Sequence, residues 1–166
     1  MAAIAVLLLT LLAGVPAFAD LRDRNQRAAI NNELVTTLAI ARTEALISRQ
    51  PTVVCPTTVD GKQCRMDGVW QHGWLAFVDG DDDGQPGGRD DRVLSYTEAM
   101  PDLTLISGTG RPRVRYAPNG MSTGSNLSIR LCQRGVPRSA VIVNNVGRPR
   151  VEIRPRALRT WSCPSD

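Results

Sequence analysis

The sequence has little of the chemistry that enzymes use. Its 166 residues contain one histidine, His72, in the run W-Q-H-G-W, and no S-x-x-K pair. A structural or surface role is expected for His72, because the run comes just before a predicted strand. We therefore expect neither catalysis nor a cofactor.

Closely spaced cysteine pairs are also missing. The four cysteines, Cys55, Cys64, Cys132 and Cys163, include no C-x-x-C pair, which argues against a zinc site. Stable disulfides belong outside the cytosol, so the cysteines indicate an oxidising compartment. Four thiols allow three connectivities. We favour Cys55–Cys64, which closes a short loop, together with Cys132–Cys163, which ties the tail to a late strand.

Aromatic residues make up only 4% of the chain. A core must therefore be built from Val, Leu and Ile, with Trp70, Trp74, Phe77 and Trp161 as the few large anchors. The part of the chain after residue 50 has a usual length for one such core.

Charge is absent from residues 2–19, which hold a single hydroxyl side chain. The run Ala17-Phe18-Ala19 fits a signal-peptide cleavage site, but no basic residue precedes the apolar core. The run also falls slightly short of the about 20 residues of a membrane helix. No turn signal follows it, so we interpret residues 1–19 as an apolar membrane or filament-core helix that continues into the next segment.

Proline and glycine are absent from residues 20–50. In this segment apolar residues recur at spacings of three and four, which is one face of an α-helix. They are Ile30, Leu34, Leu38, Ala41 and Ala45. We predict an amphipathic helix over residues 20–50 whose apolar face is covered by the rest of the chain.

Residues 51–166 change to short β-rich runs separated by Gly, Pro and Asn, some with the alternation of half-buried strands. Strands are predicted at 51–55, 73–78, 92–96, 103–107, 113–117, 125–132, 140–144 and 150–154. One helix followed by many strands is an α+β order. The expected fold is a long N-terminal helix packed across one face of an antiparallel β-sheet, in a globular domain over 51–166 with a basic C-terminal tail.

Several runs in fixed order carry a family resemblance. They are P-A-F-A-D-L at 16–21, N-x-L-x-x-x-L-x-x-A-R-T-E-A at 32–45, V-V-C at 53–55, G-W-L-A-F-V-D at 73–79, R-Y-A-P-N-G at 115–120, S-I-R-L-C at 128–132 and V-G-R-P-R-V at 146–151. Together they resemble the FimT/GspH family of minor type IV pilins and pseudopilins, in its FimT-like branch. The resemblance implies the type IV pilin fold, a single-pass inner-membrane anchor, a periplasmic globular domain, N-terminal methylation and entry into a surface pilus beside other minor and major pilins.

The start of the chain departs from that family. The resemblance implies a motif similar to G-F-T-L-I-E-L-M at the site where the leader is removed. Met1 of this chain aligns with the Met at the end of that motif. Either a leader and the first residues of the mature helix precede Met1, which we expect, or this protein lacks the leader and the Glu.

Basic charge is unevenly distributed. Residues 1–107 hold nine Lys and Arg against 14 Asp and Glu, a balance of −5, whereas residues 108–166 hold 11 Arg against two acids, a balance of +9. Arginine without lysine suits bidentate contacts to phosphate oxygens. A solubilising surface is the alternative interpretation.

The tetrapeptide G-R-P-R occurs twice, at 110–113 and 147–150. Two Arg that are two residues apart on an extended segment point the same way, so each pair could contact neighbouring phosphates. The second copy matches the G-R-x-R motif that the resemblance associates with DNA binding in natural transformation. The predicted DNA-binding residues are Gly147, Arg148, Arg150, Arg154, Arg156, Arg111 and Arg113, with Arg159 extending the charge. Alternatively, the G-R-P-R turns cap hairpins and their Arg pair with the acids at 79–91.

The acidic run D-G-D-D-D-G at 79–84 has the opening of a calcium loop. Its twelfth position is Asp90 rather than the bidentate Glu of an EF-hand, and no helical pattern flanks it. We predict a solvated turn and no metal site, with loop calcium as the alternative.

Three functions remain open. The first is a minor type IV pilin that binds DNA without sequence specificity, mainly through duplex phosphates, for DNA uptake or pilus assembly. The second is a type II secretion pseudopilin with a structural role at the filament tip and no DNA binding. The third is a soluble periplasmic domain released after Ala19.

Overall fold

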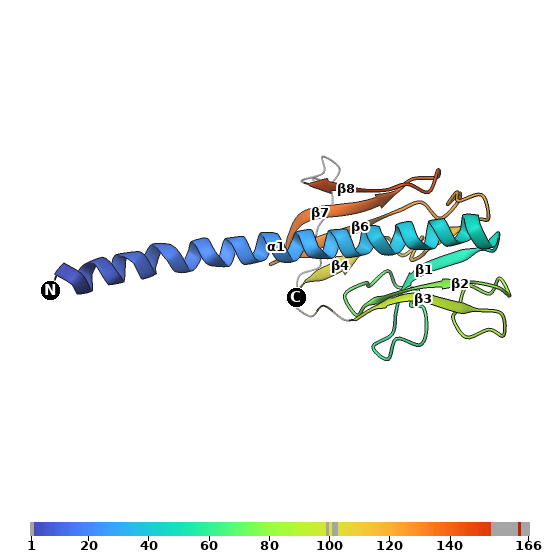
Figure 1. Ribbon diagram of the computed structural model, residues 1–166, viewed down its shortest axis with the longest axis horizontal. Coiled ribbons are helices and arrows are strands. Elements are labelled where there is room, and N and C mark those ends of the chain that lie inside the picture. Colours follow the sequence, from blue (N-terminus) through green and yellow to red (C-terminus); the bar gives the residue numbers. More distant parts are fainter. Residues whose placement is uncertain (1, 99, 101–102, 154–162, 164–166) are drawn as a thin grey trace. The chain divides into compact units, whose positions relative to one another are not determined.

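The computed structural model describes residues 2–98, 100, 103–153 and 163, with side chains from residue 18 onward. In these residues a long helix, α1 (Ala2–Ser48), is followed by eight strands (Figure 1). The strands are β1 (Thr52–Pro56), β2 (Trp74–Val78), β3 (Arg92–Thr97), β4 (Thr104–Ile106), β5 (Val114–Tyr116), β6 (Leu127–Gln133), β7 (Val136–Val143) and β8 (Pro149–Ile153). By its contacts the chain divides into two compact units, Met1–Glu33 and Leu34–Asp166.

The first unit is the N-terminal part of α1. The helix passes through Gly14, Pro16 and Ala19 without interruption, so its backbone has no break between the apolar run and the polar residues that follow. Within the described part of the chain, no helix combines the length and the apolar character that crossing a membrane requires.

In the second unit, α1 ends where the backbone of Arg49 turns left-handed, with φ of 55°. This is a common way for a helix to stop. The Ser48 hydroxyl donates to the Glu44 carbonyl (2.8 Å) and accepts a hydrogen bond from the Gln50 amide (3.3 Å). Pro51 cannot continue the helix, and the chain passes directly into β1.

The strands pair antiparallel in two four-stranded sheets, with the orders β3-β2-β1-β5 and β4-β6-β7-β8 among the described residues. The predicted antiparallel α+β fold is confirmed, but the expectation of one sheet is wrong. Alternation along a strand shows which residues share a face. It does not show which strands share a sheet, and for that reason the division was not visible in the sequence.

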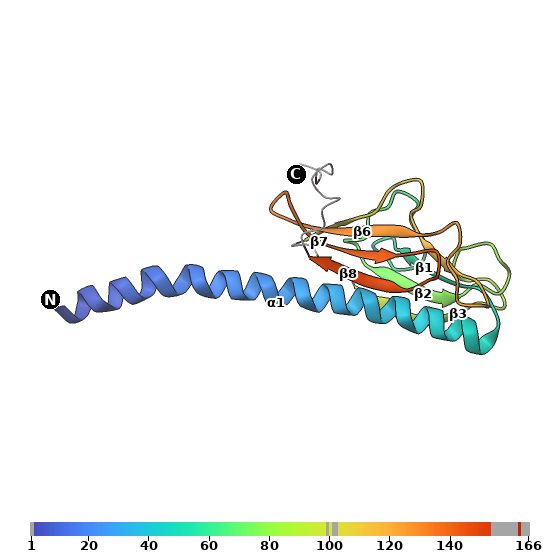
Figure 2. The same cartoon turned by 90° about the horizontal axis from the view of Figure 1, so that it is seen from above.

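The C-terminal part of α1 packs on these strands by its predicted apolar face. Leu34, Leu38, Ala41 and Ala45 are each 0% exposed. Figure 2 shows this part of α1 along one side of the strands. The Thr52 hydroxyl donates to the Ala41 carbonyl (2.8 Å), which fixes β1 against the helix.

Three of the four predicted aromatic anchors, Trp70, Trp74 and Phe77, are fully buried. Both indoles are hydrogen-bonded, as buried Trp N–H groups require. Trp70 Nε1 donates to Ser107 Oγ (3.0 Å), and Trp74 Nε1 donates to Thr37 Oγ1 on the helix (3.2 Å). Trp161 lies outside the described residues.

All eight predicted strands are present, and β7 differs most in its bounds because it begins at Val136 rather than at 140. It is joined to β6 by Arg134 and Gly135, whose φ values of 53° and 69° form a tight hairpin turn. A proline within a run of residues disfavours a central strand, except at a bulge. Pro137 is found at such a place, opposite Cys132, where the register between β6 and β7 shifts.

Both favoured disulfides are confirmed. Cys55 and Cys64 are bonded with a Cα–Cα distance of 5.5 Å, and Cys132 and Cys163 with one of 6.1 Å.

Candidate nucleic-acid interface

The second G-R-P-R copy forms the turn from β7 into β8. The Gly147 amide donates to the Asn144 carbonyl (2.8 Å), and the Arg148 amide donates to Asn144 Oδ1 (3.1 Å). Gly147 has a φ of 80°, a conformation that glycine adopts at little cost.

Close packing gives Gly147 a second reason to be glycine. A Cβ at this position would lie 2.2 Å from the Gly120 carbonyl oxygen and 3.1 Å from Tyr116 Cε1. The same Gly120 oxygen accepts a hydrogen bond from Arg42 Nε of α1 (3.0 Å). The motif's glycine therefore lets the turn pack against the neighbouring loop, and a DNA contact by Gly147 stays a prediction.

The two arginines of this copy are both exposed. In the described part of the chain, the Arg148 guanidinium makes no hydrogen bond or ion pair. Arg150 Nε and Nη2 donate to Glu152 Oε1 (3.2 and 2.9 Å). An exposed pair of this kind contributes little to stability, so Arg150 can exchange this partner for another anion.

The arginines of the first G-R-P-R copy point to different places. Arg111 Nη1 donates to the backbone carbonyl of Asn126 (3.2 Å) and to its side-chain oxygen. Arg113 instead donates to the Gly84 carbonyl in the acidic loop. This hydrogen bond ties Arg113 to the acidic loop. A DNA contact by Arg113 stays a prediction.

Arginines from both copies line one open pocket of about 550 Å³. Its side chains and backbone come from the segment before β5, from β6 and β7, and from β8. The lining residues are Gly108, Gly110, Arg111, Asn126, Leu127, Ser128, Arg130, Ile142, Val143, Asn144 and Arg150. The pocket therefore combines Arg111 of the first copy with Arg150 of the second.

Strand register explains how a third arginine, Arg130, reaches this pocket. Ser128 is opposite Ile142, which is opposite Arg150, and Arg130 is opposite Ala140 in the next row of the same face. Burial lowers the pKa of the Arg130 guanidinium from its usual value. The sequence interpretation missed Arg130, although its alternation with Ile129 and Leu131 could have placed it on the outer face.

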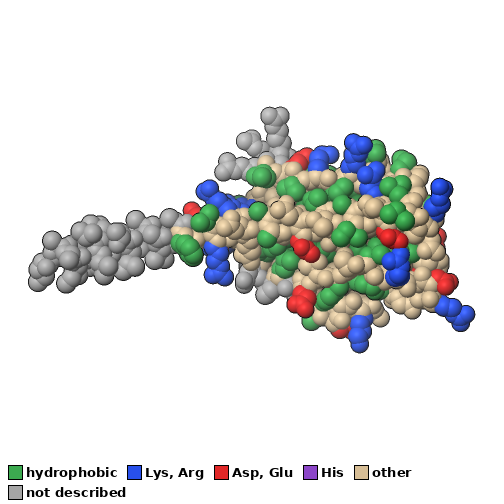
Figure 3. Space-filling model, viewed as in Figure 1, with side chains coloured by type: hydrophobic (Ala, Val, Ile, Leu, Met, Phe, Trp, Pro, Cys, Tyr) green, Lys and Arg blue, Asp and Glu red, His purple; other side chains and the backbone are tan. Residues whose placement is uncertain are grey.

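Arg138 of β7 is also exposed, and it stands at the irregular register between β6 and β7, next to Pro137. We define the arginine face as Arg111, Arg130, Arg138, Arg148 and Arg150. Figure 3 shows basic side chains gathered over β7 and β8. Arg154, Arg156 and Arg159 of the predicted site lie outside the described residues.

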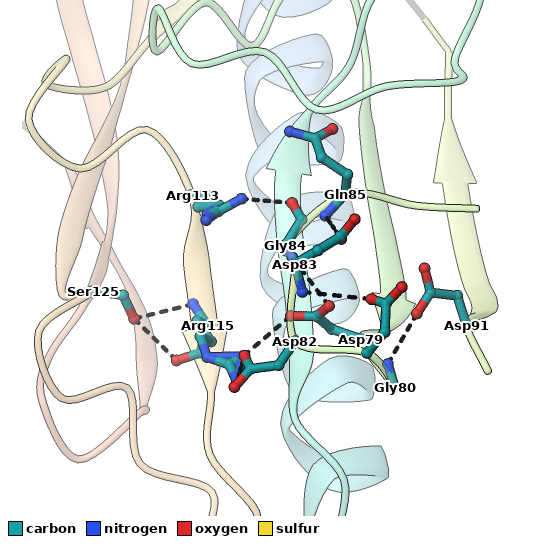
Figure 4. A network of polar contacts seen from close by, with 11 residues as sticks. Asp79, Gly80, Asp82, Asp83, Gly84, Gln85, Asp91, Arg113, Arg115 and Ser125 are labelled. Atoms are coloured by element: carbon teal, nitrogen blue, oxygen red, sulfur yellow. Dashed lines mark hydrogen bonds and ion pairs between the residues drawn. The ribbon is translucent and has the colours of Figure 1, made fainter. Parts of the chain in front are cut away.

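The acidic loop after β2 is organised by its own hydrogen bonds (Figure 4). Asp79 is 1% exposed; its Oδ1 accepts from the Gly84 amide (3.1 Å) and its Oδ2 from Arg115 (3.1 Å). Burial raises the pKa of Asp79, against the opposing effects of these two contacts. Arg115, which was not predicted to contact the loop, also pairs with Asp82.

Carboxylate oxygens of Asp79, Asp81 and Asp91 lie within 4.8 Å of one another. Asp91 already accepts hydrogen bonds from the amides of Gly80 (2.9 Å), Gly87 (3.1 Å) and Gly88 (2.8 Å). These contacts describe a hydrogen-bonded turn. Among the described residues, the acids of the loop pair with Arg115, which belongs to neither G-R-P-R copy, whereas Arg113 of the first copy reaches the loop through the Gly84 carbonyl.

The run G-M-S-T-G at 120–124 has the spacing of a hydrolase nucleophile elbow. Ser122 is fully buried, and its hydroxyl donates to the Asn144 carbonyl (2.7 Å). The run joins β5 to β6, whereas an elbow joins a strand to a helix. Ser122 therefore supports the turn before β8 and is not placed as a nucleophile.

Comparisons with known proteins agree with this fold. A family model described as Type II transport protein GspH matches residues 31–147. Among solved structures, the chain is similar to the type IV minor pilin FimU of Pseudomonas aeruginosa PAO1, with 18% identity, a TM-score of 0.59, and coverage of 86% of this chain and 96% of that one. A second crystal form of FimU gives a TM-score of 0.56.

The chain is also similar to the minor pseudopilin EpsH from the Type 2 Secretion System of Vibrio cholerae, with 16% identity, a TM-score of 0.50, and coverage of 76% of this chain and 95% of that one. At these identities the likeness concerns the fold alone. The comparison with curated proteins gave no match. Because the family model covers well over half of the sequence, the chain belongs to the GspH family of minor type IV pilins and pseudopilins, whose members are structural proteins and not enzymes.

Proposed function

We propose that this chain is a minor pilin of a type IV pilus that binds DNA through its arginine face. Membership of the family implies assembly with other pilins. The observation that carries the DNA-binding proposal is the convergence of Arg111 and Arg150, one from each G-R-P-R copy, on one pocket beside Arg130.

The charge of this face supports a polyanionic ligand. Between residues 108 and 153 the sequence has eight arginines and a single acid, Glu152. The exposed guanidinium of Arg148 stands beside Arg150, so the turn before β8 presents two cations to solvent. Arginine clusters of this kind bind phosphate oxygens with charge-assisted hydrogen bonds.

The face favours the DNA backbone over exposed bases. Single-strand binders stack bases on aromatic side chains, but Tyr116 is fully buried, and no aromatic residue lines the described pocket. Contacts to phosphates carry no direct sequence information and weaken with salt. Binding should therefore be independent of sequence, with duplex phosphates as the ligand.

The N-terminal residues fit the remaining part of the proposal. Residues 1–19 would form the membrane and filament-core segment, 20–50 the amphipathic helix, and 51–166 the periplasmic pilin domain. In this arrangement the inner membrane holds the protein before assembly, and the pilus then presents the arginine face for DNA uptake in natural transformation.

The proposal is tested by Arg148→Ala combined with Arg150→Ala in the full chain, purified in detergent. Affinity for a labelled duplex, measured by fluorescence polarisation, should fall about tenfold or more, because a hydrogen bond to a charged group contributes on the order of 1.5 kcal/mol or more. Arg89→Ala is the control, since Arg89 is exposed but lies in the acidic loop. Equal affinity of the double variant and the wild type would reject the assignment.

The second candidate function is a type II secretion pseudopilin, favoured by the name of the matching family and by the likeness to EpsH. In that case the wild-type chain would not bind DNA at low salt, and the G-R-P-R turns would contact neighbouring subunits. Incorporation of the double variant into filaments distinguishes the two: it should be normal for the DNA-binding pilin and impaired for the structural pseudopilin.

A further inference from the structure

Several hydrogen-bond donors line the pocket between the two G-R-P-R copies, and none of the described residues that line it is a carboxylate. Arg111, Arg130 and Arg150 converge on it from three different segments. Asn126 and Asn144 also line it, and the side-chain oxygen of each already accepts a hydrogen bond, from Arg111 and from the Arg148 amide. Each amide therefore keeps its NH₂ group as a donor.

The arginines retain donors as well. A guanidinium has five N–H groups. Arg111 uses only Nη1 in its contacts with Asn126, so Nε and Nη2 remain. Arg150 uses Nε and Nη2 with Glu152, so Nη1 remains. The Ser128 hydroxyl, opposite Ile142 in the row that ends at Arg150, adds another polar group.

From this donor set we infer that the pocket is a seat for one phosphate group of the bound DNA, anchored by Arg130, which belongs to neither G-R-P-R copy. The inference rests on the proposed function for the identity of the ligand. A tetrahedral phosphate has oxygens pointing in several directions, so it can accept hydrogen bonds from three segments at once. A volume of about 550 Å³ also leaves room for the adjoining sugar beside Ile142.

Arg130 differs from the other arginines of the face in its surroundings. It is half-buried in β6, whereas Arg138, Arg148 and Arg150 are exposed. Burial weakens the hydration of the Arg130 guanidinium and thereby lowers its pKa. An anion in the pocket would compensate for that loss. The two G-R-P-R copies thus contribute Arg111 and Arg150 to the phosphate site, and β6 contributes Arg130.

The test compares Arg130→Gln with Arg138→Gln, which removes the same charge from the same face outside the pocket. Duplex affinity of the full chain in detergent should fall about tenfold for Arg130→Gln, the size of one charge-assisted hydrogen bond, and less than about threefold for Arg138→Gln. Arg111→Gln should behave like Arg130→Gln. Because Arg111 is exposed, this variant also keeps the test valid if Arg130→Gln does not fold.

Inorganic phosphate provides a second measurement. At matched ionic strength it should displace DNA from the wild type more strongly than chloride does, and Arg130→Gln or Arg111→Gln should remove the difference. If the pocket variants match Arg138→Gln while Arg148→Ala with Arg150→Ala still lowers duplex affinity about tenfold or more, the phosphate seat is overturned and the DNA-binding function stands. If the wild type binds no DNA, the proposed function fails. A titration with inorganic phosphate, followed by the NMR signals of Ser128 and Ala140, then tests the phosphate site by itself: shifts of these signals support it, and unchanged signals reject it.

Discussion

At the scale of single residues, the G-R-P-R motif has parts with separate purposes. Gly147 fits between the Gly120 carbonyl and the Tyr116 ring, Arg113 holds the acidic loop, and Arg111 and Arg150 line the pocket. A repeated tetrapeptide predicts equal roles for equal positions. Tertiary contacts assign different ones, because each copy enters a different strand in a different sheet.

Gly147→Ala separates the structural role of the motif from its charge. The new Cβ would stand 2.2 Å from a backbone oxygen that cannot easily move, so we predict a loss of unfolding free energy of about 2 kcal/mol or more, measured by chemical denaturation. DNA affinity should fall too, because Arg148 shifts with the turn.

Gly124→Ala is the matched control for this change. Gly124 has a φ of 79°, nearly that of Gly147, but nothing lies within 4 Å of its added Cβ. It should therefore show only the smaller strain of about 1 kcal/mol expected for a left-handed alanine. Equal losses in the two variants would mean that the close approach to Gly120 is not what requires glycine.

At the scale of elements, the sequence predicted each strand because turn residues separate the apolar runs. The helix stripe at Leu34, Leu38, Ala41 and Ala45 was equally readable from its spacing. The pairing into two sheets was not, since it depends on contacts between distant segments. Arg130 was missed for the same reason: neither G-R-P-R copy contains it, and the register of β6, β7 and β8 brings it beside Arg150.

The contact between α1 and the first sheet gives a prediction of its own. Thr37→Val keeps the shape of the side chain but removes the acceptor of the buried Trp74 N–H. An unsatisfied buried donor costs about 1–3 kcal/mol, so the unfolding free energy should fall by that amount. Thr36→Val, at the exposed neighbouring position, should change it little. A similar loss in both variants would contradict a specific role for the Trp74 hydrogen bond.

At the scale of the whole molecule, charge is separated along the chain, with −5 before residue 108 and +9 from there on. The ion pairs of Arg115 with Asp79 and Asp82 neutralise part of the acidic loop. Of the seven other described arginines from residue 108 on, five stand on the arginine face, so an incoming polyanion would meet a cation-rich surface built by one end of the sequence.

This separation predicts a strong dependence of DNA binding on salt. Each phosphate contact releases counterions, so the logarithm of the association constant should fall linearly with the logarithm of salt concentration, by about 0.9 for every contact. Arg148→Ala with Arg150→Ala should make that slope shallower by about two. A slope for the wild type near zero would exclude phosphate contacts as the source of affinity.

The position of β8 has a consequence for how the protein behaves in concentrated solution. Among the described residues β8 pairs on one side only, with β7, so its outer edge carries backbone groups to which another chain could add a strand, beside the exposed Val151 and Ile153. Charged side chains on an edge strand discourage such addition. The arginines proposed to contact DNA should therefore also discourage strand addition at this edge, and variants that remove them should be checked for self-association by light scattering before any loss of affinity is interpreted.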